Sequence, residues 1–218
     1  MTKLCIFDLD GTLINSLSDL AGAMNHALEK NGFAPHETEK YRMMVGSGAA
    51  VLAERAMNTD SPDEDTKQRI LSDFSEYYRS HCLDNTLPYD NINELLDTLD
   101  EKGILYAVNS NKPDKFSNYI VNSLFPEKHF SCVIGKRDGF ERKPAPDGIR
   151  EIQRITGIAD DECMYIGDSD VDVYTAKNAG IKFCGAEWGF RGAAELEKAG
   201  AEHIAKNTDE LLAYILGN

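Results

Sequence analysis

The chain has 218 residues, of which 42% are hydrophobic and 28% are charged, and its formal net charge is -14. This composition is that of a globular protein, and the length suffices for one domain with a substantial insertion or for two small domains. An acidic surface repels nucleic acids and anionic membranes, so we expect neither as a partner. An anionic small molecule is not excluded, because nearby cations and backbone N-H groups dominate at short range.

The sequence gives no signal for export or for membrane insertion. No apolar run approaches the roughly 18 residues of a membrane-spanning helix, and the N-terminus lacks the apolar core and cleavage site of a secretory signal. The five cysteines are an odd number without a Cys-x-x-Cys pair, which favours reduced, buried thiols. We therefore predict a cytoplasmic protein.

The first segment with a chemical signature is KLCIFDLDGTLINS, residues 3–16. Four successive apolar residues, Leu4 to Phe7, predict a strand buried on both faces of a parallel sheet. Asp8 and Asp10 follow at its carboxyl end, which is where ligands bind in open α/β sheets. Two acids in this place suit chemistry, although a lone Asp-x-Asp is also compatible with a solvated turn.

From Ser16 to about Leu83 the apolar period becomes helical. We predict helices at Leu17 to Leu28, around 51–56 and at 62–83. An all-helical block of about 65 residues is much longer than an ordinary crossover between parallel strands, so we predict a separate α-helical cap. The expected domains are a core of residues 1–15 and 84–218 and a cap of residues 16–83.

One segment of the predicted cap suits an anion. Arg42 precedes the turn Val45-Gly46-Ser47-Gly48, which we expect to open a helix, and helix N-termini attract anions. Arg42 and Gly46 are therefore candidates for contact with the distal end of a substrate. A simple turn between two cap helices explains the same residues equally well.

Helices and strands alternate after Pro88. We predict strands at 104–108, 132–134, 163–166 and 181–184, a short strand near Ile204 and a last helix at 209–216. The segment Trp188 to Arg191 is interpreted as a packing loop.

Polar side chains follow several of these strands. Ser110 and Asn111 offer a hydroxyl and an amide that can donate hydrogen bonds to phosphate oxygens, and Lys143 lies between a charged loop and two prolines. Asp168 and Asp172 form a second acidic cluster after the strand at 163–166. The carboxyl ends of parallel strands meet at one edge of the sheet, so we expect these groups to converge.

Four segments together resemble the motifs of the haloacid dehalogenase-like superfamily. They are Asp8-Leu9-Asp10-Gly11-Thr12, Ser110, Lys143-Pro144-Ala145-Pro146, and Gly167-Asp168 with Asp172. The segments 19–28 and 45–56 are more loosely similar to the phosphoglycolate phosphatases of that superfamily. The resemblance implies an α/β fold: a Rossmann-like, doubly wound parallel sheet with an inserted α-helical cap.

The resemblance also implies a mechanism. It identifies Asp8 as a nucleophile and Asp10 as an acid/base, in a Mg²⁺-dependent phosphatase that hydrolyses a small, phosphoglycolate-like phosphomonoester through an aspartyl phosphate. The implied ligands of Mg²⁺ are Asp8, the backbone carbonyl of Asp10, and Asp168, while Asp172 orients a group beside the metal. The implied phosphate-binding residues are Ser110, Asn111 and Lys143.

Several alternatives remain at this point. A β-phosphoglucomutase-like phosphotransferase has a His where this chain has Leu20, and an inorganic pyrophosphatase on the same fold stays open. Asp10 argues against a dehalogenase, which has no oxygen leaving group to protonate. A non-enzymatic phospho-acceptor module would be about half as long and would lack a cap. We expect a small phosphorylated metabolite as the partner and either a monomer or a homodimer.

Overall fold

The centre of the structure is a six-stranded parallel sheet in the order β5-β4-β1-β6-β7-β8. Its strands are β1 (Leu4–Phe7), β4 (Leu105–Pro113), β5 (Val133–Lys136), β6 (Cys163–Gly167), β7 (Lys182–Ala186) and β8 (Ile204–Ala205). β1 is central because all four of its residues are apolar and fully buried. The chain builds outward from β1 in opposite directions, through β4 and β5 on one side and through β6, β7 and β8 on the other.

The computed structural model describes residues 1–58 and 63–217. They divide into a core unit, Met1–Ile14 with Pro88–Asn218, and a helical unit, Asn15–Leu87. The sequence predicted an insert of residues 16–83 after the first strand. Residue 62, where its third helix was predicted to begin, lies outside the described residues.

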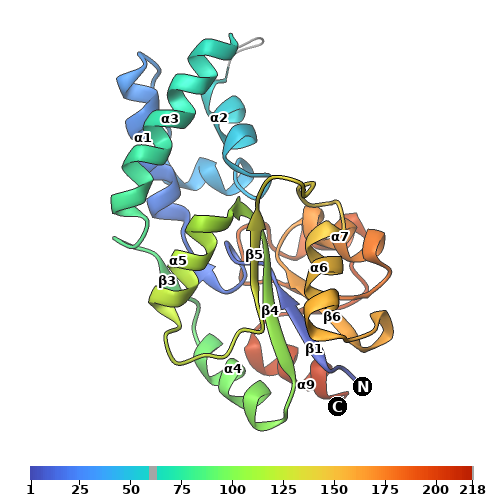
Figure 1. The fold of residues 1–218 in the computed structure, drawn as a ribbon. Coiled ribbons are helices and arrows are strands. Elements are labelled where there is room, and N and C mark those ends of the chain that lie inside the picture. The colour runs from blue at the N-terminus through green and yellow to red at the C-terminus, as the bar shows by residue number, and fades with distance from the viewer. Residues whose placement is uncertain (59–62, 218) are drawn as a thin grey trace. The chain divides into compact units, whose positions relative to one another are not determined.

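Helices cover both faces of the sheet in the core unit (Figure 1). Figure 1 shows α4 (Ile92–Glu101) and α5 (Asp114–Leu124) on one side of β4 and β5, and α6 (Asp147–Thr156) on the other. The remaining helices of this unit are α7 (Asp170–Ala179), α8 (Ala193–Ala199) and α9 (Thr208–Leu216), with a short 3₁₀ helix at Asp160–Glu162. The predicted doubly wound α/β fold with an inserted helical unit is therefore confirmed.

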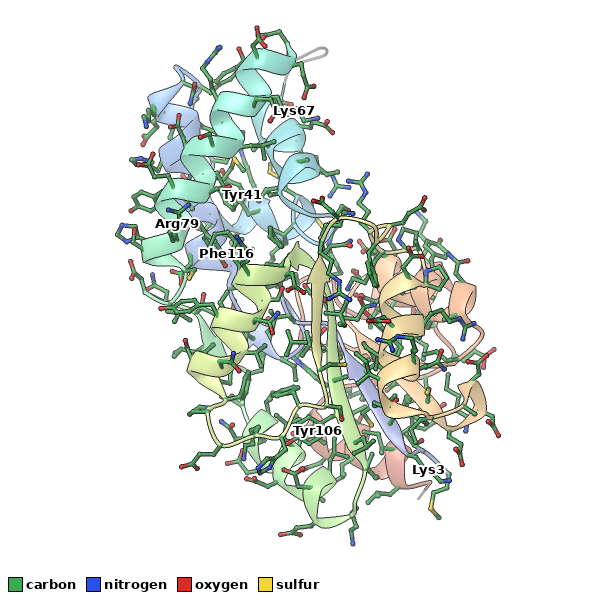
Figure 2. The ribbon with its side chains drawn as sticks, in the orientation of Figure 1. Lys3, Tyr41, Lys67, Arg79, Tyr106 and Phe116 are labelled. Carbon is green, nitrogen blue, oxygen red and sulfur yellow. The ribbon has the colours of Figure 1, made fainter. Side chains whose placement is uncertain are left out.

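A continuous apolar layer holds α6 and α7 on the sheet. Ile149 and Ile152 from α6 and Ala176 from α7 pack in one buried cluster with Leu4 and Ile6 of β1. Each fully buried aliphatic side chain contributes about 1.5–3 kcal/mol relative to exposure, so this layer fixes the strand ends that carry polar residues. At the opposite end, where the strands begin, the hydroxyl of Tyr106 donates to Asp100 at 2.9 Å (Figure 2).

The helical unit contains α1 (Leu17–Lys30), a 3₁₀ helix (Thr38–Met43), α2 (Ala49–Met57) and α3 (Glu64–His81). The buried hydroxyl of Tyr41 donates to Asn25 Oδ1 at 2.6 Å (Figure 2). Two short strands, β2 (Ile14–Asn15) and β3 (Leu87–Pro88), pair with each other where the chain leaves and rejoins the core unit. No described helix is long and apolar enough to cross a membrane.

The buried carboxylate of Asp19 organises the base of the helical unit. It accepts hydrogen bonds from the backbone N-H groups of Asn85 and Thr86 at 2.9 to 3.0 Å, and from the Thr86 hydroxyl at 2.7 Å. Charge-assisted bonds of this kind are stronger than neutral ones. Asp19 thus ties the start of α1 to the segment that leads into β3.

Candidate active site

The predicted polar residues of the core unit converge at the carboxyl edge of the sheet, beside β1. Asp8 follows β1, Asp168 follows β6, and Lys143 lies in the connection between β5 and α6. Ser110 and Asn111 lie within β4, which continues to Pro113, and not in a loop after a strand that ends at residue 108. Both side chains are buried there and not exposed to solvent.

The Asp8 carboxylate is held in a fixed orientation. Its Oδ1 accepts a hydrogen bond from the Leu9 N-H at 2.7 Å and lies 2.8 Å from Lys143 Nζ. Burial raises the pKa of Asp8 to about 7, helped by the negative charges of Asp172 and Asp10 and opposed by the Lys143 ammonium. The site thus disfavours the charged form of Asp8 unless additional positive charge is supplied.

Lys143 is the ammonium at the centre of the cluster. Its Nζ lies 2.8 Å from Asp8 Oδ1 and 2.7 Å from Asp172 Oδ1, and it donates to the Tyr165 hydroxyl at 3.1 Å. Burial by itself lowers the pKa of Lys143, but the charges of Asp172 and Asp8 outweigh burial and raise that pKa well above its usual value. The lysine is therefore a fixed positive charge beside Asp8.

Both carboxylate oxygens of Asp172 contact other groups of the protein. Oδ1 pairs with Lys143, while Oδ2 accepts hydrogen bonds from Ser169 Oγ at 2.7 Å and Ser169 N at 3.1 Å. The bond from the N-cap backbone to the carboxylate at the third helical position is half of a capping box at the start of α7. Asp172 therefore links the α7 N-terminus to Lys143.

Asn111 clasps the backbone of Lys143. Its Oδ1 accepts from Lys143 N at 2.7 Å, and its Nδ2 donates to Lys143 O at 3.2 Å. The Asn111 amide, which the sequence suggested as a phosphate-binding group, thus positions the loop that contains Lys143. Phosphate binding by Asn111 stays a prediction. Tyr165, which the sequence did not identify, does similar work: it donates to Asn109 O at 3.0 Å while accepting from Lys143.

The interpretation of residues 188–191 as a packing loop was incomplete, because the loop touches the acids. Phe190 N donates to Asp168 Oδ2 at 2.7 Å, and Trp188 Nε1 donates to Thr12 O at 3.0 Å. A Cβ on Gly189 would lie 2.2 Å from Asp168 Cβ and 2.4 Å from Gly11 O. The loop packs so closely that position 189 has no room for a side chain.

Gly11 is required for two separate reasons. Its φ of +86° lies in the left-handed region, and a Cβ would lie 2.5 Å from Asp168 Oδ2. The turn after Asp8 can thus approach the end of β6 only with glycine at position 11.

The acids of the site suit a hard divalent cation. Carboxylate oxygens from Asp8, Asp168 and Asp172, all buried, lie within 4.8 Å of one another. Burial, together with the charges of Asp172 and Asp8, raises the pKa of Asp168 well above its usual value. Oxygen ligands are those that Mg²⁺ prefers, and a cation would relieve the repulsion among these groups. The donor set therefore fits the predicted Mg²⁺.

Two further basic residues, Lys112 and Arg42, lie in different units of the chain. Lys112, on β4, lies with its Nζ 3.1 Å from Asp10 Oδ2, and this neighbour of the predicted acid/base was not singled out from the sequence. Arg42 and Gly46 belong to the helical unit, where Arg42 Nε pairs with Glu39 Oε2 at 2.7 Å. Contact of either helical-unit residue with a substrate stays a prediction.

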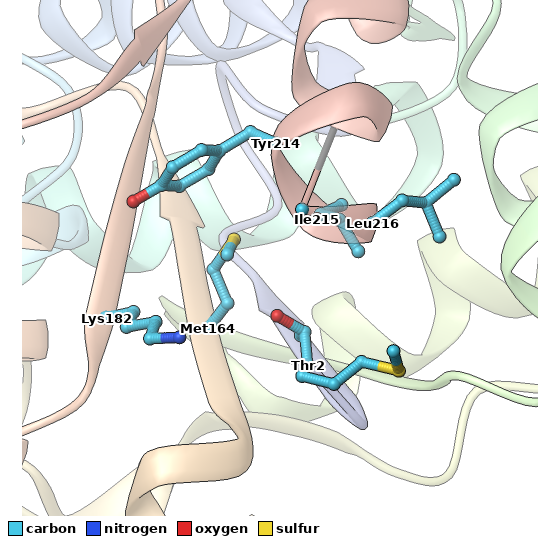
Figure 3. A pocket seen from close by; sticks show the side chains of 8 residues that line it. Thr2, Met164, Lys182, Tyr214, Ile215 and Leu216 are labelled. Carbon is cyan, nitrogen blue, oxygen red and sulfur yellow. The ribbon is translucent and has the colours of Figure 1, made fainter.

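A cavity of about 550 Å³ opens elsewhere on the core unit (Figure 3). It is lined by Met1, Thr2, Met164, Lys182 and residues 214–217. Met164 and Lys182 lie near the starts of their strands, so the cavity is at the opposite edge of the sheet from Asp8. It is not the site of the converging carboxylates.

The parallel sheet with its buried acids and Lys143 indicates an enzyme, and comparison with known proteins identifies its family. The haloacid dehalogenase-like hydrolase family matches residues 5–186. The chain belongs to that family.

Several proteins similar to this chain carry the narrower name phosphoglycolate phosphatase. The chain is 34% identical over 195 residues to the phosphoglycolate phosphatase of Pseudomonas fluorescens strain Pf0-1, covering 87% of this chain and 71% of that protein. It is 32% identical to the phosphoglycolate phosphatase of Vibrio parahaemolyticus, covering 98% and 96%. A crystal structure from Lactobacillus delbrueckii subsp. bulgaricus, provisionally assigned as a phosphoglycolate phosphatase, matches with a TM-score of 0.93 and 34% identity, covering 100% of both chains. The predicted enzyme class, a phosphoric monoester hydrolase, is confirmed.

The raised pKa of Asp8 predicts a pH-dependent stability. Between its ordinary pKa of 3.8 and about 7, folded Asp8 keeps a proton that the unfolded chain has lost, so the free energy of unfolding falls as pH rises through this window. Asp8→Asn removes this fall in the free energy of unfolding, which is about 4 kcal/mol at most. With metal chelated, the difference in melting temperature between Asp8→Asn and wild type should grow in favour of the variant from pH 4 to pH 8.

The matched control is Asp138→Asn, an exposed acid of the core unit. Its melting temperature should follow that of wild type across the same range. A constant difference between Asp8→Asn and wild type would contradict the electrostatic account of the site.

Proposed function

We propose that the protein is a Mg²⁺-dependent phosphatase that hydrolyses a small phosphomonoester through an aspartyl phosphate on Asp8, with phosphoglycolate as the favoured substrate. The single observation that carries this proposal is the buried Asp8 held by Lys143 beside Asp168 and Asp172. Phosphomonoesters are largely dianionic near neutral pH, so a carboxylate can attack one only where positive charge offsets the repulsion. Lys143 and a bound cation together would provide that charge.

In the first step, an oxygen of Asp8 attacks phosphorus while the bond from phosphorus to the ester oxygen breaks. The leaving oxygen takes a proton from Asp10, which lies two residues beyond the nucleophile on the same turn. Lys143 would neutralise one phosphoryl oxygen, and the buried hydroxyl of Ser110 would donate to another. The products of this step are an alcohol and an acyl phosphate on Asp8.

In the second step, water loses a proton to Asp10 and attacks phosphorus, releasing inorganic phosphate and regenerating Asp8. Asp10 thus ends the cycle protonated, as it began. Closure of the helical unit as a cap would exclude bulk water during the first step.

Asp8, the backbone carbonyl of Asp10, and Asp168 would hold Mg²⁺, which supplies charge neutralisation at the transferring phosphoryl group. Asp172 would support this arrangement indirectly, because both of its oxygens are engaged by Lys143 and Ser169. Phe190 N would fix Asp168 by holding one of its oxygens.

The substrate proposal draws on the relatives. The proteins from Pseudomonas fluorescens and Vibrio parahaemolyticus carry the name phosphoglycolate phosphatase, and the second matches over nearly the whole of both chains. A shared fold by itself does not fix a substrate, so direct assay is needed.

Released phosphate should be measured across phosphoglycolate, ethyl phosphate, β-glucose 1-phosphate and pyrophosphate, with and without Mg²⁺. We expect Mg²⁺-dependent hydrolysis with the highest kcat/KM on phosphoglycolate, and a loss of at least about a thousandfold, near 4 kcal/mol, in Asp8→Asn. Preference for pyrophosphate would favour the pyrophosphatase alternative. An Asp8→Asn variant with more than about a tenth of wild-type activity would exclude Asp8 as the nucleophile.

A second prediction isolates Asp10. Asp10→Asn keeps the backbone carbonyl but cannot transfer a proton, so kcat should fall more on ethyl phosphate than on p-nitrophenyl phosphate, whose leaving group scarcely needs protonation. General acid catalysis is worth about 10²–10⁴-fold, which sets the expected size of the difference. Equal losses on the two esters would mean that Asp10 does not protonate the leaving group.

A further inference from the structure

Lys112 places a second buried cation in the site, on the side of Asp10. Its side chain is 4% exposed, and its Nζ lies 3.1 Å from Asp10 Oδ2, whereas Lys143 lies against Asp8 and Asp172. Lys143 thus serves the phosphoryl side of the site, and Lys112 the side of the predicted acid/base. The proposed hydrolysis does not itself require two lysines in these separate places.

The backbone of Lys112 is fixed by close packing. Its carbonyl accepts from Ser117 Oγ at 3.3 Å, its N-H donates to Ser110 Oγ at 3.2 Å, and a Cβ on Gly135 would lie 2.7 Å from that carbonyl. The neighbouring strand therefore approaches it as closely as glycine allows. The side chain starts from a rigid position on β4 and is not a mobile surface lysine.

The burial of Lys112 beside the partly exposed Asp10 is not explained by stability alone. Removing a lysine ammonium from water costs several kcal/mol, which attraction to one neighbouring carboxylate only partly offsets, and an apolar residue of similar size often serves folding equally well. Lys112 lies beside Asp10, which is proposed to protonate the leaving oxygen. Its ammonium is therefore placed to contact the rest of the leaving group.

The distances define what Lys112 can reach. Asp10 must come within about 3 Å of the leaving oxygen to transfer a proton. When Asp10 transfers the proton through Oδ2, the oxygen 3.1 Å from Lys112 Nζ, the ammonium lies within about 6 Å of the leaving oxygen. In a phosphorylated 2-hydroxy acid, a single carbon separates the ester oxygen from a carboxylate. An ammonium at this distance can form an ion pair with such a carboxylate, about 2.8 Å long.

We infer that Lys112 recognises a carboxylate on the leaving group, one carbon from the ester oxygen, and so selects phosphorylated 2-hydroxy acids over neutral alkyl phosphates. The inference rests on the proposed function, and it deepens that proposal by assigning the recognition to a residue of the core sheet. It differs from the prediction for Arg42, which is half-exposed and paired with Glu39 in the helical unit.

The kinetic test compares kcat/KM on phosphoglycolate and ethyl phosphate for wild type, Lys112→Met and Lys112→Gln. Both substrates have alkoxide leaving groups, so a loss of acid/base catalysis lowers both rates. We expect the ratio of the two kcat/KM values to fall at least tenfold in both variants, mainly through KM for phosphoglycolate. The control, Lys115→Met, removes an exposed lysine three residues away and should keep the wild-type ratio.

Binding to Asp8→Asn gives a readout without turnover. Calorimetric titration with phosphoglycolate in the presence of Mg²⁺ should show weaker binding, at least tenfold, when Lys112→Met is added to Asp8→Asn. Binding of ethyl phosphate should be unchanged. A melting curve for each variant identifies unfolding, and Lys112→Gln, which keeps a polar end, is the variant to use where Lys112→Met does not fold.

Three outcomes would overturn the inference. Equal losses on both substrates would make Lys112 a positioning residue for Asp10 only. A collapse of the ratio in Arg42→Ala but in neither Lys112 variant would place carboxylate recognition in the helical unit. Equal binding of phosphoglycolate with and without Lys112 would exclude the ion pair. Failure of wild type to hydrolyse any phosphomonoester would instead reject the proposed function, and the binding comparison would still decide the role of Lys112.

Discussion

The contact on which the site depends is the ion pair between Lys143 and the two acids Asp8 and Asp172. All three side chains are almost wholly buried, so removal of the ammonium would leave two uncompensated carboxylates, at a cost of about 3–5 kcal/mol. Two other side chains hold this lysine in place. The Asn111 amide forms hydrogen bonds with its backbone, and the Tyr165 hydroxyl accepts a hydrogen bond from its ammonium. The same arrangement leaves Asp8 short of positive charge, which suits a cation and a dianionic substrate.

The sheet brings these residues together because its order reverses beside β1. Parallel strands expose their carboxyl ends at one edge, and β1 lies between β4 and β6, so residues that are far apart in sequence become neighbours. Close packing completes the arrangement. Gly11 and Gly189 allow the turn after β1 and the loop after β7 to contact Asp168, where any side chain would collide with the carboxylate or with backbone.

Much of this was predictable from local patterns. The apolar run before Asp8 and the acids after the strand at 163–166 correctly indicated buried strands and a shared edge, and the predicted helix from Leu17 to Leu28 forms as part of α1. What the sequence could not supply was side-chain pairing across distant elements. Nothing near Asn111 indicates that its amide binds the backbone of Lys143, and Tyr165 looks like any apolar strand residue. The loop at 188–191 was interpreted as packing alone, because a backbone N-H that donates to Asp168 has no signature in the sequence.

The central claim is that Asp8 forms a covalent bond to phosphorus, and an acid-quenched reaction tests it most directly. Rapid mixing of enzyme, Mg²⁺ and phosphoglycolate, followed by acid quench, proteolysis and mass spectrometry, should show one added phosphoryl group on the peptide that contains Asp8. The addition should be mapped to Asp8 and should be lost after treatment with hydroxylamine, which cleaves acyl phosphates. Hydrolysis of the substrate with no phosphoryl group on that peptide at any quench time, or with the group mapped to another residue, would contradict the account.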